Sequence, residues 1–96
     1  MKQEVLARVL PRVEYFAALM GAQYSGIRIT EAKKRWGSCS GKNSLNFSFL
    51  LAEKPPEFLD SVVIHELCHT FHHDHSQAFW QMVKRYDPHF PGKRPG

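Results

Sequence analysis

Five of the six histidines in this 96-residue chain lie between positions 65 and 75. The stretch opens with His-Glu-Leu-Cys-His, in which His65 and His69 stand four residues apart. On a helix, residues with this spacing lie on one face, about 6 Å apart along the axis, so both imidazoles can reach one Zn²⁺ ion. Glu66 lies about 100° around such a helix, beside the ion, where its carboxylate can take a proton from metal-bound water. The pattern predicts a hydrolytic zinc site.

A catalytic zinc ion needs a third protein ligand and one open position. Four side chains that follow the second histidine are candidates: His72, His73, Asp74 and His75. On a straight helix, His72 lies about 10 Å from His65, too far to share the ion, and His73 points farther around. His75 follows His69 by six residues, which is the third-histidine spacing of H-E-x-x-H-x-x-G-x-x-H enzymes. We therefore predict His75 as the third ligand, with Asp74 as the second choice.

The turn glycine of that longer pattern is replaced by His72 in this chain. Histidine is among the residues enriched at positive φ, so this position can still allow the turn. The two cysteines, Cys39 and Cys68, are too few for a disulfide scaffold and are expected to be small core residues. Ligation by a thiolate would favour a closed structural site over a catalytic one.

Apolar residues recur at helical spacing from residue 3 to residue 20, so we expect a helix there. Pro11 lies inside this pattern and should kink the helix or begin its second part, and Gly21 is suited to end it. Alternating segments at 26–30 (GIRIT) and 45–51 (LNFSFLL) predict two short strands. The residues between them are rich in Gly, Ser and Asn and should be strand ends and turns.

The helix that carries the histidines should begin at Pro55-Pro56-Glu57, because proline is tolerated in the first turn and an acidic residue is favoured there. Four apolar residues should be buried on its other side: Val62, Val63, Leu67 and Phe71. Asp74 or Ser76 can cap a last helix over residues 77–86, and the prolines at 88, 91 and 95 should end regular structure. The order helix, small sheet, helix, helix predicts one α+β domain spanning residues 1–96.

Composition limits the classes of function. The formal net charge of +4 and the short basic clusters at 33–35 and 93–94 are not the footprint of a dedicated nucleic-acid binder. Charged residues interrupt every apolar run at the start, so no signal peptide is expected, and no stretch reaches the ~20 apolar residues of a membrane span. We expect a cytoplasmic protein without a membrane partner.

Four motifs occur in order along the chain: RWGSCS at 35–40, LNF at 45–47, HELCH at 65–69, and His75-Ser76 with Phe79-Trp80. Together, over roughly residues 33 to 90, they resemble the YgjP-like metallopeptidase domain, a relative of the SprT-like and WSS-type zinc peptidases. The resemblance implies a zincin-like fold, with a small sheet over an active-site helix and the RWGSC stretch on strands near the cleft. It also implies zinc held by His65, His69 and His75, with Glu66 as the general base. Some members of this family are described as nucleotide pyrophosphatases.

Three functions follow as hypotheses. The first is zinc-dependent hydrolysis of a peptide or protein, with the substrate paired to the edge of the LNFSFLL strand and held by Asn46 or Arg35. The second keeps the zinc but hydrolyses a nucleoside triphosphate, with phosphate contacts from the cations at 33–35; no Gly-rich phosphate loop supports it. The third is non-enzymatic: a structural zinc, or a domain that binds nucleic acid or another partner.

Overall fold

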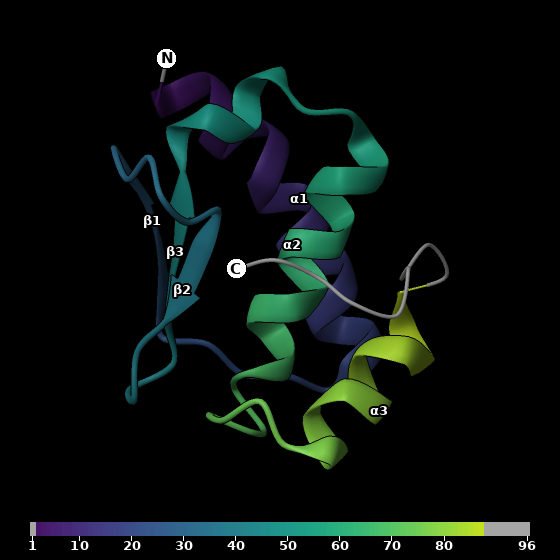
Figure 1. Ribbon diagram of the computed structural model, residues 1–96. Coiled ribbons are helices and arrows are strands. Elements are labelled where there is room, and N and C mark those ends of the chain that lie inside the picture. Colours follow the sequence, from purple (N-terminus) through teal and green to yellow (C-terminus); the bar gives the residue numbers. More distant parts are fainter. Residues whose placement is uncertain (1, 88–96) are drawn as a thin grey trace.

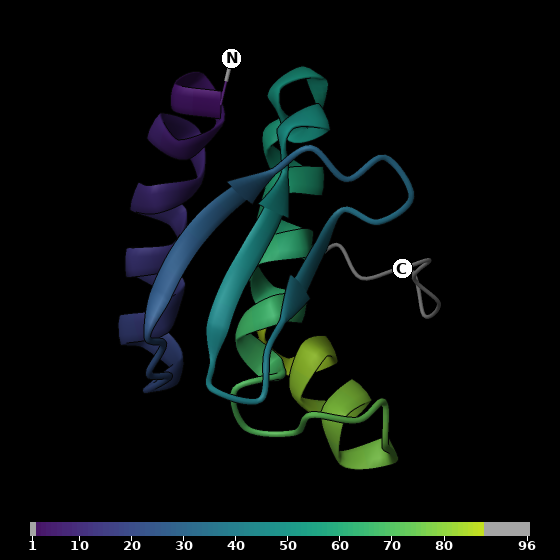
Figure 2. The ribbon, with the colours of Figure 1, turned by 90° about the vertical axis from the view of Figure 1, so that its left-hand side faces the viewer.

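A computed structural model describes residues 2–87, and the expected end of regular structure at Pro88, Pro91 and Pro95 and the basic cluster at 93–94 lie outside these residues. The chain folds in the order α1 (Lys2–Met20), β1 (Gly26–Thr30), β2 (Gly37–Cys39), β3 (Ser44–Ser48), a 3₁₀ helix η1 (Phe49–Glu53), α2 (Pro56–Cys68) and α3 (Gln77–Tyr86). Helices α1 and α2 pack side by side on one face of the sheet, and α3 lies against the C-terminal part of α2 (Figures 1 and 2). The α+β prediction is confirmed.

Helix α1 continues through Pro11 and ends at Gly21, whose φ of 72° is costly for any residue with a Cβ atom. Its buried face is built from Val5, Val9 and Val13, each separated by one helical turn. Near its start, Arg8 donates hydrogen bonds to three carbonyl oxygens of residues 51–54, at 3.0, 2.7 and 2.8 Å. The guanidinium thereby fixes the segment that leads from η1 into α2.

Strand β3 is the central strand of the sheet, in the order β1-β3-β2. It pairs in parallel with β1 and antiparallel with β2, so neither of its edges is open. The hypothesis that a substrate adds to the edge of this strand is therefore wrong. The error arose because a local sequence pattern does not show that a strand pairs on both sides. The open edge that adjoins α2 belongs to β2, which lies in the segment expected to hold strand ends and turns.

Strand β3 is also shorter than the predicted strand 45–51. Ser48 ends it, because its side-chain oxygen accepts a hydrogen bond from the Leu50 backbone N–H at 3.1 Å and so begins η1. Leu45 and Phe47 remain inward-facing and are fully buried in the core between sheet and helices. The alternation correctly predicts the strand itself, whereas the side-chain cap turns residues 49–51 into the start of a 3₁₀ helix.

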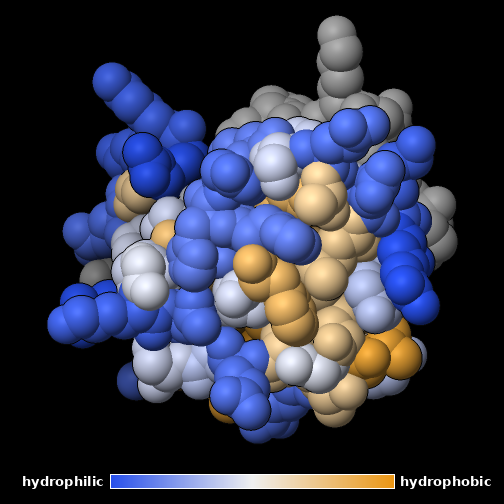
Figure 3. Space-filling view, turned by 90° about the horizontal axis from the view of Figure 1, so that it is seen from below, coloured by the Kyte–Doolittle hydropathy of each residue, from blue (hydrophilic) through white to orange (hydrophobic). Residues whose placement is uncertain are grey.

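Helix α2 begins at Pro56, as predicted, and its residues Val62, Val63 and Leu67 are buried. Phe71 was expected on the same buried side but is 42% exposed, because α2 ends at Cys68 and the helical period does not extend to it. Figure 3, a view from below, shows apolar surface in the middle of that face with hydrophilic side chains around it. Within residues 2–87, no helix is long and apolar enough to cross a membrane.

Candidate active site

The last turn of α2 places three polar side chains in the interior. His65 and Glu66 are each 3% exposed and His69 is 9% exposed, although a glutamate is almost never fully buried without a partner. The helix that carries them is held on its other side by the core, so their positions are fixed by packing. Buried polar groups on a rigid helix need compensation from ligands or hydrogen bonds.

The chain leaves α2 through a tight turn and then returns to the same place. The N–H groups of Thr70, Phe71 and His72 bind carbonyl oxygens of the last turn of α2, which ends the helix in an orderly way. The turn does not use positive φ at His72, because Asn43 is the only non-glycine residue with positive φ between residues 2 and 87. The glycine of the longer motif is thus replaced without backbone strain.

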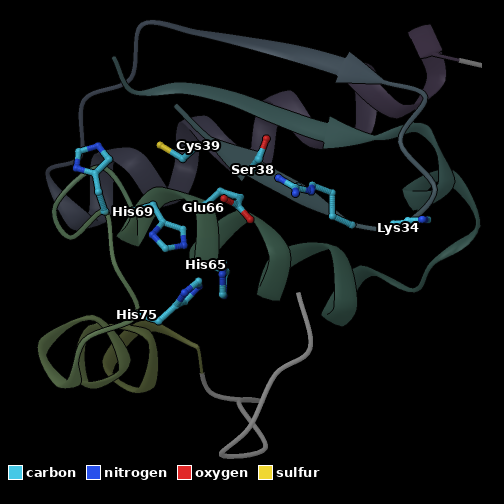
Figure 4. A pocket seen from close by; sticks show the side chains of 10 residues that line it. Lys34, Ser38, Cys39, His65, Glu66, His69 and His75 are labelled. Atoms are coloured by element: carbon cyan, nitrogen blue, oxygen red, sulfur yellow. The ribbon is translucent and has the colours of Figure 1, made fainter. Parts of the chain in front are cut away.

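His75 comes back to the two histidines of α2. One ring nitrogen from each of His65, His69 and His75 lies within 4.8 Å of the others, and Figure 4 shows the three rings gathered beside Glu66. A tetrahedral zinc ion with bonds of 2.0–2.1 Å holds its ligand atoms about 3.4 Å apart. Small side-chain rotations are therefore enough for these nitrogens to bind one ion.

The backbone of His72 and the side chains of His73 and Asp74 have other partners. The carbonyl oxygen of His72 lies 2.9 Å from Nδ1 of His69, while Nε2 of His73 lies 3.1 Å from Oδ1 of Asn43. Oδ1 of Asp74 accepts a hydrogen bond from the Ser76 N–H at 3.3 Å, at the start of α3. Among the described residues, the three-nitrogen cluster contains none of these side chains.

The contact with His72 sets the tautomer of His69. A carbonyl oxygen can only accept, so Nδ1 carries the proton and Nε2 keeps its lone pair for a metal. Burial lowers the pKa of His69, which favours the neutral ring that a metal ligand requires. This arrangement is typical of metal-binding histidines, in which the second nitrogen donates to a carbonyl or carboxylate.

Helix α3 supports the histidines with an aromatic side chain. The ring of Phe79 is fully buried, and its centroid lies 5.0, 4.4 and 5.1 Å from those of His65, His69 and His75. Ser76 caps α3 by accepting the Phe79 N–H at 3.4 Å, as one of the two predicted caps. From the sequence, Phe79 is recognised only as part of the last helix and of the fourth motif.

Strand β2 lies directly against Glu66. A Cβ atom built on Gly37 would be 3.1 Å from Cγ and 3.2 Å from Oε2 of Glu66, and 2.9 Å from the backbone oxygen of Asn46. Position 37 therefore admits glycine alone without movement of the strand or the carboxylate. The sequence places this glycine among strand ends and turns, and the family resemblance places it on a strand near the cleft, but neither reveals its contact with Glu66 of α2.

Burial raises the pKa of Glu66 to about 8, and the charge of Arg35 opposes that change. Its Oε1 atom is buried and has no hydrogen-bond partner within the part of the chain that the structure describes. A buried carboxylate oxygen without a partner is costly in free energy. Such an atom beside three convergent imidazoles marks a place where a ligand is expected.

The model of the YgjP-like, metallopeptidase domain family matches residues 1–94 of the chain. The chain belongs to this family. The match includes α1, which lies outside the motifs that first indicated the resemblance.

Two solved structures are similar to this YgjP-like domain. The crystal structure of the metallopeptidase zymogen of Pyrococcus abyssi abylysin has a TM-score of 0.74 and 25% identity, over 83% of this chain and 80% of that chain. That of the metallopeptidase zymogen of Methanocaldococcus jannaschii jannalysin has a TM-score of 0.70 and 22% identity, over 81% and 80%; this second likeness concerns the fold alone. A comparison with curated proteins found no match. The zincin-like fold and the metallopeptidase class are thus confirmed.

The site of the YgjP-like domain opens into a cleft of about 400 Å³. Besides the three histidines and Glu66, its lining comprises Lys34, Arg35, Gly37, Ser38, Cys39 and His73. Arg35, which the sequence predicts to hold the substrate, lines this cleft. Asn46 is absent from the described lining, and its side-chain amide donates to Oγ of Ser38 at 3.3 Å, so that it supports β2.

The two cysteines differ in position. Cys68 is fully buried among apolar residues, as expected, whereas Cys39 on β2 faces the cleft and is only partly buried. Burial raises the pKa of Cys39 to about 11 and that of Cys68 to about 12, so both remain thiols at neutral pH. Neither belongs to the cluster of candidate metal ligands.

Proposed function

We propose that this metallopeptidase-family domain hydrolyses peptide bonds with a zinc ion held by His65, His69 and His75, and with Glu66 as the general base. The observation that carries the proposal is the convergence of three ring nitrogens within 4.8 Å, beside a buried carboxylate oxygen that has no partner among the described residues. The donor set fits zinc, which accepts nitrogen ligands in tetrahedral geometry. The fixed tautomer of His69 adds to this fit.

A zinc ion bound by the three imidazoles would supply Lewis-acid chemistry, acting on a water molecule and on the scissile carbonyl. The three imidazoles hold the ion, and Phe79 keeps their rings in place. Glu66 removes the proton from the attacking water at its unpartnered oxygen and later delivers a proton to the leaving amine nitrogen. Its burial favours this exchange, because a carboxylate in an apolar environment accepts a proton more readily.

An extended peptide or protein segment has a place to pair beside the site. Strand β2 is an edge strand whose residues line the cleft, so its backbone can hydrogen-bond to a substrate chain. Arg35 precedes this strand and contacts the substrate, while Asn46 contributes by holding Ser38 in the sheet. The two free cysteines agree with a reducing, cytoplasmic location.

A structural zinc site usually closes the ion with four protein ligands. Among the described residues the cluster has three, and a carboxylate beside it has no structural purpose there. A catalytic role for the ion is therefore favoured over a structural one.

The test uses the zinc-loaded protein and an unfolded protein substrate. Glu66→Gln should bind one zinc ion per chain, measured by elemental analysis, and lose at least about a hundredfold in kcat/KM; Glu57→Gln, on the exposed start of the same helix, is the matched control. His75→Ala should lose the ion, whereas Asp74→Asn should keep it. Normal cleavage by Glu66→Gln would refute the mechanism, and release of pyrophosphate from a nucleoside triphosphate without peptide cleavage would favour the nucleotide hypothesis.

A further inference from the structure

Two cations line the cleft next to the proposed reaction centre. Lys34 and Arg35 lie just before β2 and are separated from it by Trp36; both are exposed, and both belong to the cleft lining together with Glu66 and the histidines. Figure 4 shows Lys34 at the far end of the cleft, with Glu66 between it and the three histidines. Neither cation takes part in an ion pair recorded among residues 2–87.

The charge of these cations is not balanced by the rest of the lining. Glu66 is the only carboxylate among the described lining residues, and no salt bridge joins it to Arg35. In the proposed mechanism the Glu66 carboxylate takes part in proton transfer, so it does not form a permanent ion pair with Arg35. With a divalent ion bound as well, this end of the cleft attracts anionic groups.

Strand geometry sets how far these cations lie along a bound peptide. Gly37 lies against Glu66, and Arg35 precedes it by two residues with a bend at Trp36, so their Cα atoms are at most about 6–7 Å apart. A peptide paired with the open edge of β2 covers the same distance in two residues. Its side chain beside Arg35 therefore lies within two residues of the bond that is cleaved.

We propose that Lys34 and Arg35 form an acid-selective subsite, which favours peptides with an Asp or Glu side chain within two residues of the scissile bond. The inference rests on the proposed peptidase function and adds the class of substrate. A peptide carboxylate fits this place better than a nucleotide phosphate, because the cations lie next to the open edge of β2 and no phosphate-binding loop accompanies them. A guanidinium binds a carboxylate through paired hydrogen bonds, and a lysine adds a second charge.

The experiment compares two peptides that differ only by Glu or Gln at one position, for each position within two residues of the cleaved bond. Zinc-loaded wild-type protein should cleave the Glu peptide with a kcat/KM about tenfold higher at the best position, since each solvent-exposed pair contributes a few-fold. The double variant Lys34→Gln/Arg35→Gln should bring this ratio close to one. Lys33→Gln removes an adjacent exposed charge that does not line the cleft, and should keep the wild-type ratio.

Two further arms separate the possible failures. Zinc-loaded Glu66→Gln should bind the Glu peptide about tenfold more tightly than the Gln peptide, measured by fluorescence anisotropy, and the preference should shrink in 0.5 M salt. If wild-type protein cleaves neither peptide, the peptidase proposal fails, and the binding ratio still decides on the subsite. Equal kcat/KM and equal binding for both peptides overturn the subsite, as does an unchanged ratio in the double variant. Pyrophosphate release that depends on the two cations, without acidic-peptide preference, also overturns it.

Discussion

Replacement of Gly37 by alanine tests whether the close approach of β2 to Glu66 matters for the reaction. The added methyl group would lie 2.9 Å from the backbone oxygen of Asn46 and 3.1 Å from Cγ of Glu66. Ordinary contacts of this kind begin at 3.4 Å, so about 0.5 Å and 0.3 Å must be gained. The Asn46 oxygen belongs to a paired central strand and cannot yield easily, so β2 or the carboxylate has to move.

The expected loss follows from that displacement. A misplacement of about 1 Å near the reacting atoms costs about a hundredfold in rate, so a shift of about half that size should cost about tenfold in kcat/KM. Crowding of a packed contact should also lower the free energy of unfolding by about 1–3 kcal/mol. The rate should be measured on a peptide at a temperature where urea titration shows both proteins folded and elemental analysis shows both carrying zinc.

The matched control is Gly26→Ala. Gly26 also lies in a strand, but a Cβ atom built there has no neighbour within 4 Å and its φ is not positive. This variant should keep wild-type activity and stability. Wild-type kcat/KM for folded, zinc-loaded Gly37→Ala would show that the spacing between β2 and Glu66 is irrelevant to turnover.

Three other predictions concern the surroundings of the site. Arg8→Lys should lower the free energy of unfolding in urea by about 1–2 kcal/mol, because a single ammonium nitrogen cannot take the places of the two guanidinium nitrogens that reach the carbonyl oxygens of residues 51–54. An unchanged urea midpoint would show that these hydrogen bonds add nothing to stability. Phe79→Leu should lower the free energy of unfolding by less than about 1.5 kcal/mol. Its affinity for zinc, measured by competition with a chelator, should fall about tenfold. An affinity equal to that of the wild type would show that the phenyl ring does not hold the histidine rings in place. Iodoacetamide at pH 8 should modify Cys39 and Cys68 at least about a hundredfold more slowly in the native protein than in denaturant. The reason is that raised pKa values, about 11 for Cys39 and about 12 for Cys68, leave little thiolate. Rapid labelling of the native protein would contradict those values.

The spacing of His65, Glu66 and His69 could be interpreted from the sequence because helical geometry is local. The place of His75 also followed from the chain length needed to turn back, and the three nitrogens do converge. These inferences needed no knowledge of which distant segments meet. The cap at Ser76 was equally local, since a side chain and the next backbone N–H groups suffice to form it.

The predictions that failed depended on contacts between distant segments. The strand that begins at Leu45 was correctly found, but its central place in the sheet depends on pairing with two other strands. The contact of Gly37 with Glu66 was missed because the two residues are far apart along the chain. Phe71 was assigned to a buried helix face because the helix was expected to continue beyond Cys68.

Phe79 belongs to the apolar core and also contacts all three histidine rings. Docking of α3 and capture of the ion are therefore thermodynamically linked, because a displaced α3 removes the surface against which the rings are arranged. The free energy of metal binding then stabilises the packing of α3, a ten-residue helix that makes few contacts with the sheet. When the ion is lost, α3 should detach from α2 first, before the sheet and α1 separate.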